Sequence, residues 1–114
     1  MRKLHIITIL FFLSTLPSLV HAEWKKVSIN VSGTEFYLDY KSIRKHSGYI
    51  YVWRLDNHLK PDKDGMLSEK TYSEIDCKRL RLKYLSASFH SMPMGEGPAL
   101  NITISNLNEW IYFP

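Results

Sequence analysis

Apolar residues recur at every second position along most of the chain after residue 22, and this spacing constrains the fold more than any other feature. Val27, Ile29 and Val31 alternate with polar residues, Ser32-Gly33-Thr34 follows, and the run 36–40 alternates again. A period of two sends successive side chains to opposite faces, as in a β-strand, whereas an amphipathic helix needs a spacing of three or four. The two runs and the turn between them therefore predict a β-hairpin.

The run 49–55 predicts the strongest strand. Its alternate side chains are mostly apolar on both faces, with Tyr49, Tyr51, Trp53 and Leu55 on one and Ile50, Val52 and Arg54 on the other. A strand that is apolar on both faces belongs in the middle of a sheet, so we expect this strand to be central and Trp53 to lie in the core.

Further extended runs predict strands at 68–77, 78–92, 100–104 and 109–113. Between the strands we expect an exposed loop at 57–67 and a polar connection with one helical turn at 41–47. After Tyr84 the apolar parity shifts by one residue, which predicts a β-bulge. The whole pattern predicts a mainly β fold, a single curved six-stranded antiparallel sheet. No amphipathic helix is available to cover one face. Either the sheet curls on itself, another chain covers it, or the chain as given is short at its C-terminus.

Residues 1–22 have the parts of a cleavable secretory signal. Arg2 and Lys3 begin it, an uncharged apolar run fills 4–20, and Val20-His21-Ala22 supplies short side chains before the cleaved bond. The alternative is an uncleaved membrane anchor, for which the run is barely long enough. No cysteine precedes Cys77, so we expect no lipid anchor. We expect a signal peptide at 1–22, one domain at 23–114, and export to the periplasm, the cell surface or the medium.

The expected mature domain is only weakly basic. The chain has 15 Lys and Arg and 11 Asp and Glu, and two of the basic residues belong to the signal, which leaves a formal charge of +2. Such a small charge argues against a nucleic-acid partner. No Gly-x-Ser-x-Gly segment occurs, and His46, His58 and His90 lie far apart, at no metal-ligand spacing. We therefore expect no enzyme, no catalytic residue, no metal and no cofactor.

A row of cations is the one positive indication of a binding site. Arg79, Arg81 and Lys83 alternate along one expected strand, so their side chains would share a face at intervals of about 7 Å. Such a row suits an anionic polymer or an acidic protein surface. The alternative is a solvated face or an edge strand that its charges protect from association.

Cys77 is the only cysteine of the chain. In an oxidising compartment a single cysteine indicates a disulfide whose partner is absent from the chain, or pairing between molecules. A buried thiol that acts as a small hydrophobic side chain is the alternative.

Short segments in a particular order run through the expected mature domain: Trp24, Phe36-Tyr37-Leu38-Asp39 with Ser42-Ile43, Val52-Trp53, Ile75-Asp76-Cys77-Lys78 with Arg81 and Tyr84, the Gly95 loop, and Trp110-Ile111-Tyr112-Phe113-Pro114. In this order and spacing they resemble the surface-adhesin protein E family of bacterial envelope proteins. The resemblance implies a six-stranded antiparallel sheet with a C-terminal helix, which a disulfide from Cys77 holds against the sheet. This chain ends at Pro114, so we expect that helix to be absent or truncated.

The same resemblance implies binding rather than catalysis. It implies an exported, adhesin-like protein that binds host matrix or other protein or anionic ligands. The alternative is a periplasmic binding or envelope-maintenance module without a host partner. Because the sheet lacks cover, a homodimer is a further expectation.

Overall fold

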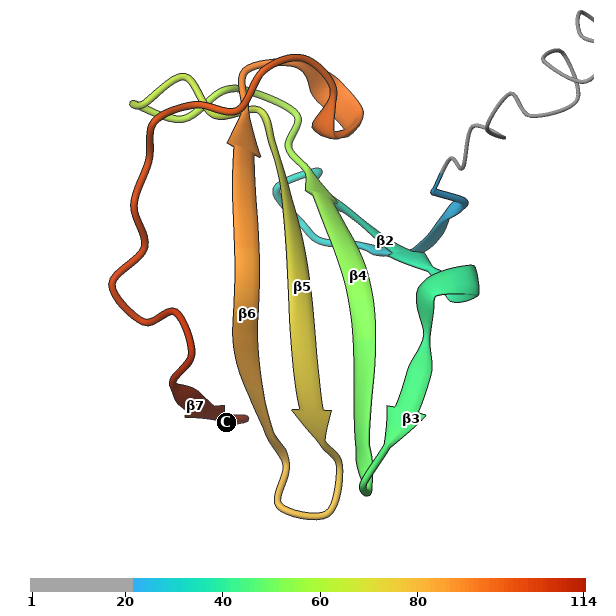
Figure 1. The fold of residues 1–114 in the computed structure, drawn as a ribbon. Coiled ribbons are helices and arrows are strands. Elements are labelled where there is room, and N and C mark those ends of the chain that lie inside the picture. The colour runs from blue at the N-terminus through green and yellow to red at the C-terminus, as the bar shows by residue number, and fades with distance from the viewer. Residues whose placement is uncertain (1–21) are drawn as a thin grey trace, which may run out of the picture.

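The computed structural model describes residues 22–114, which form one open antiparallel sheet of seven strands (Figure 1). The strands are β1 (Trp24–Ile29), β2 (Glu35–Asp39), β3 (Arg44–His46), β4 (Tyr49–Asn57), β5 (Ser68–Asp76), β6 (Arg81–His90) and β7 (Trp110–Tyr112). Their order is β1-β2-β4-β5-β6-β7, and β3 also pairs with β4. Apart from Ala22, the expected signal peptide lies outside the described residues.

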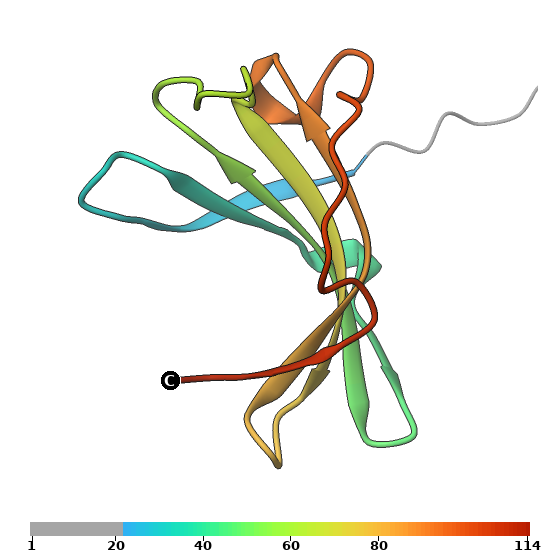
Figure 2. The same cartoon turned by 90° about the vertical axis from the view of Figure 1, so that its left-hand side faces the viewer.

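The single antiparallel sheet and the central strand are confirmed. β4 pairs with β2 and β3 on one side and with β5 on the other. The sheet is strongly twisted, and the β1–β2 hairpin crosses the direction of β4, β5 and β6 steeply (Figure 2). Two short 3-10 turns, η1 (Tyr40–Ser42) and η2 (Pro93–Gly95), are the only helical segments among residues 22–114.

The structure has one strand more than predicted, because Arg44–His46 forms β3. This strand pairs with Tyr49–Tyr51 of β4 across the tight turn at Ser47 and Gly48. Its three residues are all polar and exposed, so they leave no hydrophobic period to detect. The expected strand at 100–104 is wrong: only Ala99 forms a β-bridge, with His90, before the chain leaves the sheet.

The predicted β-bulge in β6 is confirmed, and it decides which face receives the cations of that strand. Tyr72 of β5 pairs with Ser86, but the next residue, Ser73, pairs with Tyr84. Leu85 is therefore the extra residue. The bulge reverses the side-chain parity, so that Lys83 lies on the same face as Ser86 instead of the opposite one.

The strand register defines two faces. Residues directly opposite each other on paired strands point to the same face, so Tyr51, Trp53 and Leu55 of β4 share a face with Lys70 and Tyr72 of β5. We call this the aromatic face. The other face carries Val52, Thr71 and Phe89, among others, and we call it the core face. The segment after η2 descends beside β6 to β7, where Ile104 and Asn106 line a small cavity with core-face residues (Figures 1 and 2).

The hydrophobic core is small. Val52, Leu55 and Phe89 are the only buried apolar side chains within 22–114, and only Leu55 is fully buried. The expectation that Trp53 lies in the core is wrong, because this side chain is only half-buried. The reason is that Trp53 points to the aromatic face, which no strand or α-helix covers in the described part of the chain.

The η2 turn covers one end of the aromatic face through a buried serine. Ser68 Oγ donates a hydrogen bond to Met92 O at 2.6 Å and accepts one from Gly95 N at 2.8 Å. Gly95 has a φ of +66°, and a Cβ at this position would lie 2.8 Å from Cδ of Lys70, so glycine is required both by conformation and by space. Lys70 is thus held beneath the turn.

Replacing Ser68 by alanine is expected to destabilise the fold by about 1–3 kcal/mol, since it leaves the buried N–H of Gly95 and the carbonyl of Met92 without their partner. The measurement is a thermal melt. Ser86→Ala is the matched control. Ser86 lies on β6 and points to the same face of the sheet as Ser68, but it is exposed. Equal melting temperatures for the two variants would contradict this role of Ser68.

Candidate binding site

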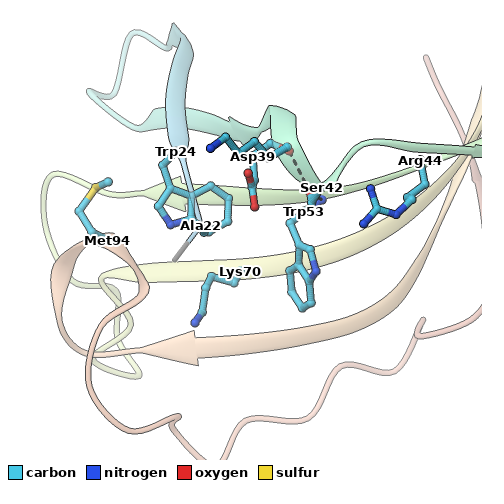
Figure 3. A pocket seen from close by; sticks show the side chains of 9 residues that line it. Ala22, Trp24, Asp39, Ser42, Arg44, Trp53, Lys70 and Met94 are labelled. Carbon is cyan, nitrogen blue, oxygen red and sulfur yellow. Dashed lines mark hydrogen bonds between the residues drawn. The ribbon is translucent and has the colours of Figure 1, made fainter. Parts of the chain in front are cut away.

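A hollow of about 390 Å³ opens on the aromatic face, between the start of β1 and the middle of β4 (Figure 3). We call it the tryptophan hollow. It is lined by Ala22, Trp24, Asp39, Lys41, Ser42, Arg44, Trp53, Lys70 and Met94. These residues come from five parts of the chain, so only the folded sheet assembles the site.

Strand pairing, hydrogen bonds and a ring contact position the two tryptophans. Trp24 is placed by its pairing with Asp39 across β1 and β2. The backbone N–H of Trp53 donates a hydrogen bond to Ser42 Oγ at 3.2 Å, and the same hydroxyl donates to the backbone carbonyl of Asp39 at 2.8 Å. The Trp53 ring also lies against the Tyr72 ring, with 5.1 Å between the centroids. The η1 turn and β4 therefore hold the Trp53 side of the hollow in one arrangement.

The charge around the tryptophan hollow is predominantly positive. Lys41 forms an ion pair with Glu23 at 2.8 Å, and this contact raises the pKa of Lys41 and lowers the pKa of Glu23. Arg44 and Lys70 have no carboxylate within 4.0 Å among residues 22–114. Two aromatic rings beside two uncompensated cations suit a ligand that is apolar on one side and anionic on another.

The predicted cationic row is only partly formed. β6 begins at Arg81, and Arg79 lies in the turn 77–80, so the expectation that Arg79 alternates with the others on one strand is wrong. Arg79 and Arg81 both bind the carboxylate of Asp76, at 3.2 and 3.0 Å, and Asp76 is 2 % exposed. Burial opposes ionisation of Asp76, but hydrogen bonds from Arg81 and Arg79 outweigh it and hold its pKa below the ordinary value.

Arg81 and Lys83 are nevertheless together on the aromatic face. Arg81 lies 4.0 Å and Lys83 4.3 Å from the centroid of the Trp110 ring on β7. Lys83 has no carboxylate within 4.0 Å in the part of the chain that the structure describes. The ligand-binding role of Arg79, Arg81 and Lys83 stays a prediction, and Lys83 is the member whose charge is least engaged within the protein.

Aromatic rings lie between the two cationic regions. Trp53 contacts Tyr72, and Tyr72 stacks on Tyr51 with 6.3 Å between centroids. Further along, Tyr49 contacts Trp110 at 5.8 Å. The aromatic face therefore carries the tryptophan hollow at one end, the Lys83–Trp110 contact at the other, and aromatic rings between them. Sequence reasoning missed this surface, because its residues are brought together by strand register.

Cys77 is exposed and free, in the turn between β5 and β6. The buried-thiol alternative is therefore wrong. A disulfide of Cys77 with a partner outside this chain stays a prediction.

No group of three or more potential metal-ligating side chains occurs within residues 22–114. Two of the three histidines of the domain make structural hydrogen bonds. His58 Nδ1 lies 3.0 Å from Thr34 Oγ1, and His90 Nδ1 lies 3.1 Å from Gly97 O. Ser88 Oγ also lies 2.9 Å from His90 Nε2, but His90 is only 4 % exposed, and its other ring nitrogen is bound to the Gly97 carbonyl and not to a carboxylate. The open surfaces of the described residues are those of the aromatic face.

The described residues include no helix of the length and hydropathy that crossing a bilayer requires. The family model for surface-adhesin protein E matches residues 24–114, which include every strand of the sheet. Searches of curated proteins and of solved structures returned no significant match.

Proposed function

Because this chain belongs to the surface-adhesin protein E family, we propose that it is an exported envelope protein that binds protein or anionic-polymer ligands through the aromatic face and catalyses no reaction. The ligands would be host matrix components or similar acidic molecules. The family suggests a surface adhesin-like protein, and the ligand class is inferred from the site.

The observation that supports this proposal is the grouping of uncompensated cations with aromatic rings on one face. Arg44 and Lys70 flank the tryptophan hollow, and Lys83 stands over Trp110. The small charge of the mature domain makes a general attraction to polyanions weak, so binding would depend on this local arrangement.

Replacing Arg44, Lys70 and Lys83 together by serine is expected to lower the affinity for immobilised heparin by about 10-fold or more, and to reduce its salt dependence. Heparin is used here as a probe of anionic polymers. Arg79 and Arg81 are left intact, because their removal would strand the buried carboxylate of Asp76.

The control is the variant with Lys45, Lys60 and Lys63 replaced by serine, which changes the net charge equally. Lys45 lies next to Arg44 on β3 but points to the opposite face, and Lys60 and Lys63 lie in the exposed 58–67 loop. Equal losses in the two triple variants would mean that net charge alone governs binding, and the proposed site would be abandoned.

The location of the protein separates an adhesin from a periplasmic module without a host partner. An adhesin must be accessible from outside, so protease added to intact cells should degrade it while a periplasmic marker survives. Protection of the protein until the outer membrane is opened would favour the periplasmic alternative.

A further inference from the structure

We propose that cleavage of the Ala22–Glu23 bond creates an ion pair between the new α-ammonium of Glu23 and the carboxylate of Asp39, and that this pair fastens the start of β1 to the sheet. Hydrolysis by a leader peptidase consumes a water molecule, leaves a carboxylate on Ala22, and leaves an amine on Glu23 that takes up a proton at neutral pH. The proposal rests on the proposed export only for the cleavage step.

The carboxylate that would accept the ammonium already lies beside Glu23 N. Glu23 N donates a hydrogen bond to Asp39 Oδ1 at 3.3 Å, and the neighbouring Trp24 pairs with Asp39 across the two strands. Asp39 is 8 % exposed, yet no Lys or Arg nitrogen of residues 22–114 lies within 4.0 Å of its carboxylate. A buried carboxylate without a cation is costly, and an ammonium at the position of Glu23 N would provide one.

Charges of both signs surround this point. In the uncleaved chain, Lys41 binds the carboxylate of Glu23 at 2.8 Å and acts on Asp39 only from a longer distance. The new ammonium would complete an alternating series of two negative and two positive groups. Lys25 also acts on Glu23, and Arg44 and Lys70 line the same hollow. These cations oppose a further positive charge, so the stabilisation of the ammonium comes from its contact with Asp39.

The ion pair would have two consequences. β1 is an edge strand held by β2 alone, so an anchor at its first residue limits fraying of the strand that carries Trp24. Ala22 is also one of the residues that line the tryptophan hollow. Cleavage would remove Ala22 and so open this side of the hollow in the mature protein.

The ion pair is tested with two recombinant chains, one beginning at Glu23 and one at Ala22, each with Asp39 and with Asp39→Asn. Both contain all seven strands. In the chain that begins at Glu23, the α-ammonium should titrate about one pH unit above its ordinary value of about 7.7–8.0, as followed by NMR. Asp39→Asn should return the pKa to the ordinary value.

The pH dependence of stability provides a second readout. A cation whose pKa is raised by folding contributes stability below its unfolded pKa and loses it as the pH rises through the folded value. The melting temperature of the Glu23 chain should therefore fall more between pH 7 and pH 10 than that of the Ala22 chain, and Asp39→Asn should abolish the difference. Identical titration of the two α-ammonium groups, or an unchanged difference with Asp39→Asn, would overturn the ion pair.

The cleavage step is tested separately. The whole gene is expressed in a bacterium that exports the product, and the mass of the purified protein is measured. A mass that corresponds to residues 23–114 is expected. A first residue other than Glu23 would overturn maturation at this bond, whatever the heparin experiment shows.

Discussion

Replacing Leu55 by alanine is expected to destabilise the domain by about 2–5 kcal/mol, a large part of the roughly 5–10 kcal/mol that holds a domain of this size together. Leu55 is 0 % exposed and is one of three buried apolar side chains in the described part of the chain. Removing most of its side chain loses burial and leaves a cavity in a core that has few other contacts to compensate. The melting temperature should fall by about 10 °C or more.

The matched control is Leu59→Ala, which makes the same chemical change in a side chain that is 70 % exposed. Its melting temperature should stay within about 2 °C of wild type, since exposed substitutions away from special features change stability by less than about 0.5 kcal/mol. Similar losses in both variants would show that the few buried residues around Leu55 do not dominate the stability.

Replacing Glu69 by glutamine is expected to stabilise the protein at pH 8 by about 1–2 kcal/mol. This free energy is smaller than the raised pKa of Glu69 alone would imply, because the carboxyl is partly solvated. Burial of Glu69, together with the neighbouring carboxylate of Asp56, raises the pKa of Glu69 from 4.5 to about 7. Asp56 pairs with Glu69 across β4 and β5, and the compensating cation, Arg54, binds Asp56 instead at 2.9 Å. Glutamine removes the charge and keeps the shape.

The sign of the pH dependence follows from the raised pKa. The folded state holds the Glu69 proton more tightly than the unfolded state does, so this group's contribution to stability falls as the pH rises from about 4.5 to about 7. The difference between the melting temperatures of wild type and Glu69→Gln should therefore be small at pH 4 and grow to pH 8. Glu96→Gln, at an exposed position, should show no such growth. A difference that is flat with pH would contradict the raised pKa.

Much of the local structure follows from the order of residues alone. The period-two alternation placed the main strands correctly, because whether a side chain faces in or out depends on its position along its own strand. The parity shift after Tyr84 revealed the bulge for the same reason. The apolar character of both sides of the run 49–55 identified β4 as central. The strand that was missed, β3, is polar throughout and has no such pattern.

What binds, and where, depended on tertiary structure. The sequence placed Arg79 in a row with Arg81 and Lys83, but the turn before β6 directs it to Asp76 instead, since turn geometry is not visible in a hydrophobic period. Trp53 was expected in the core, yet it lines a hollow, because only the packed sheet decides which of two apolar faces is left open.

The sequence alone thus determined the strands, the bulge and the likeness to a family, because each of these depends on residues that are close together in the chain. The tertiary structure decided the aromatic face, the tryptophan hollow and the contact between Glu23 and Asp39. These features join residues up to several strands apart, and strand register, which brings such residues together, is set by the whole sheet and not by any one segment.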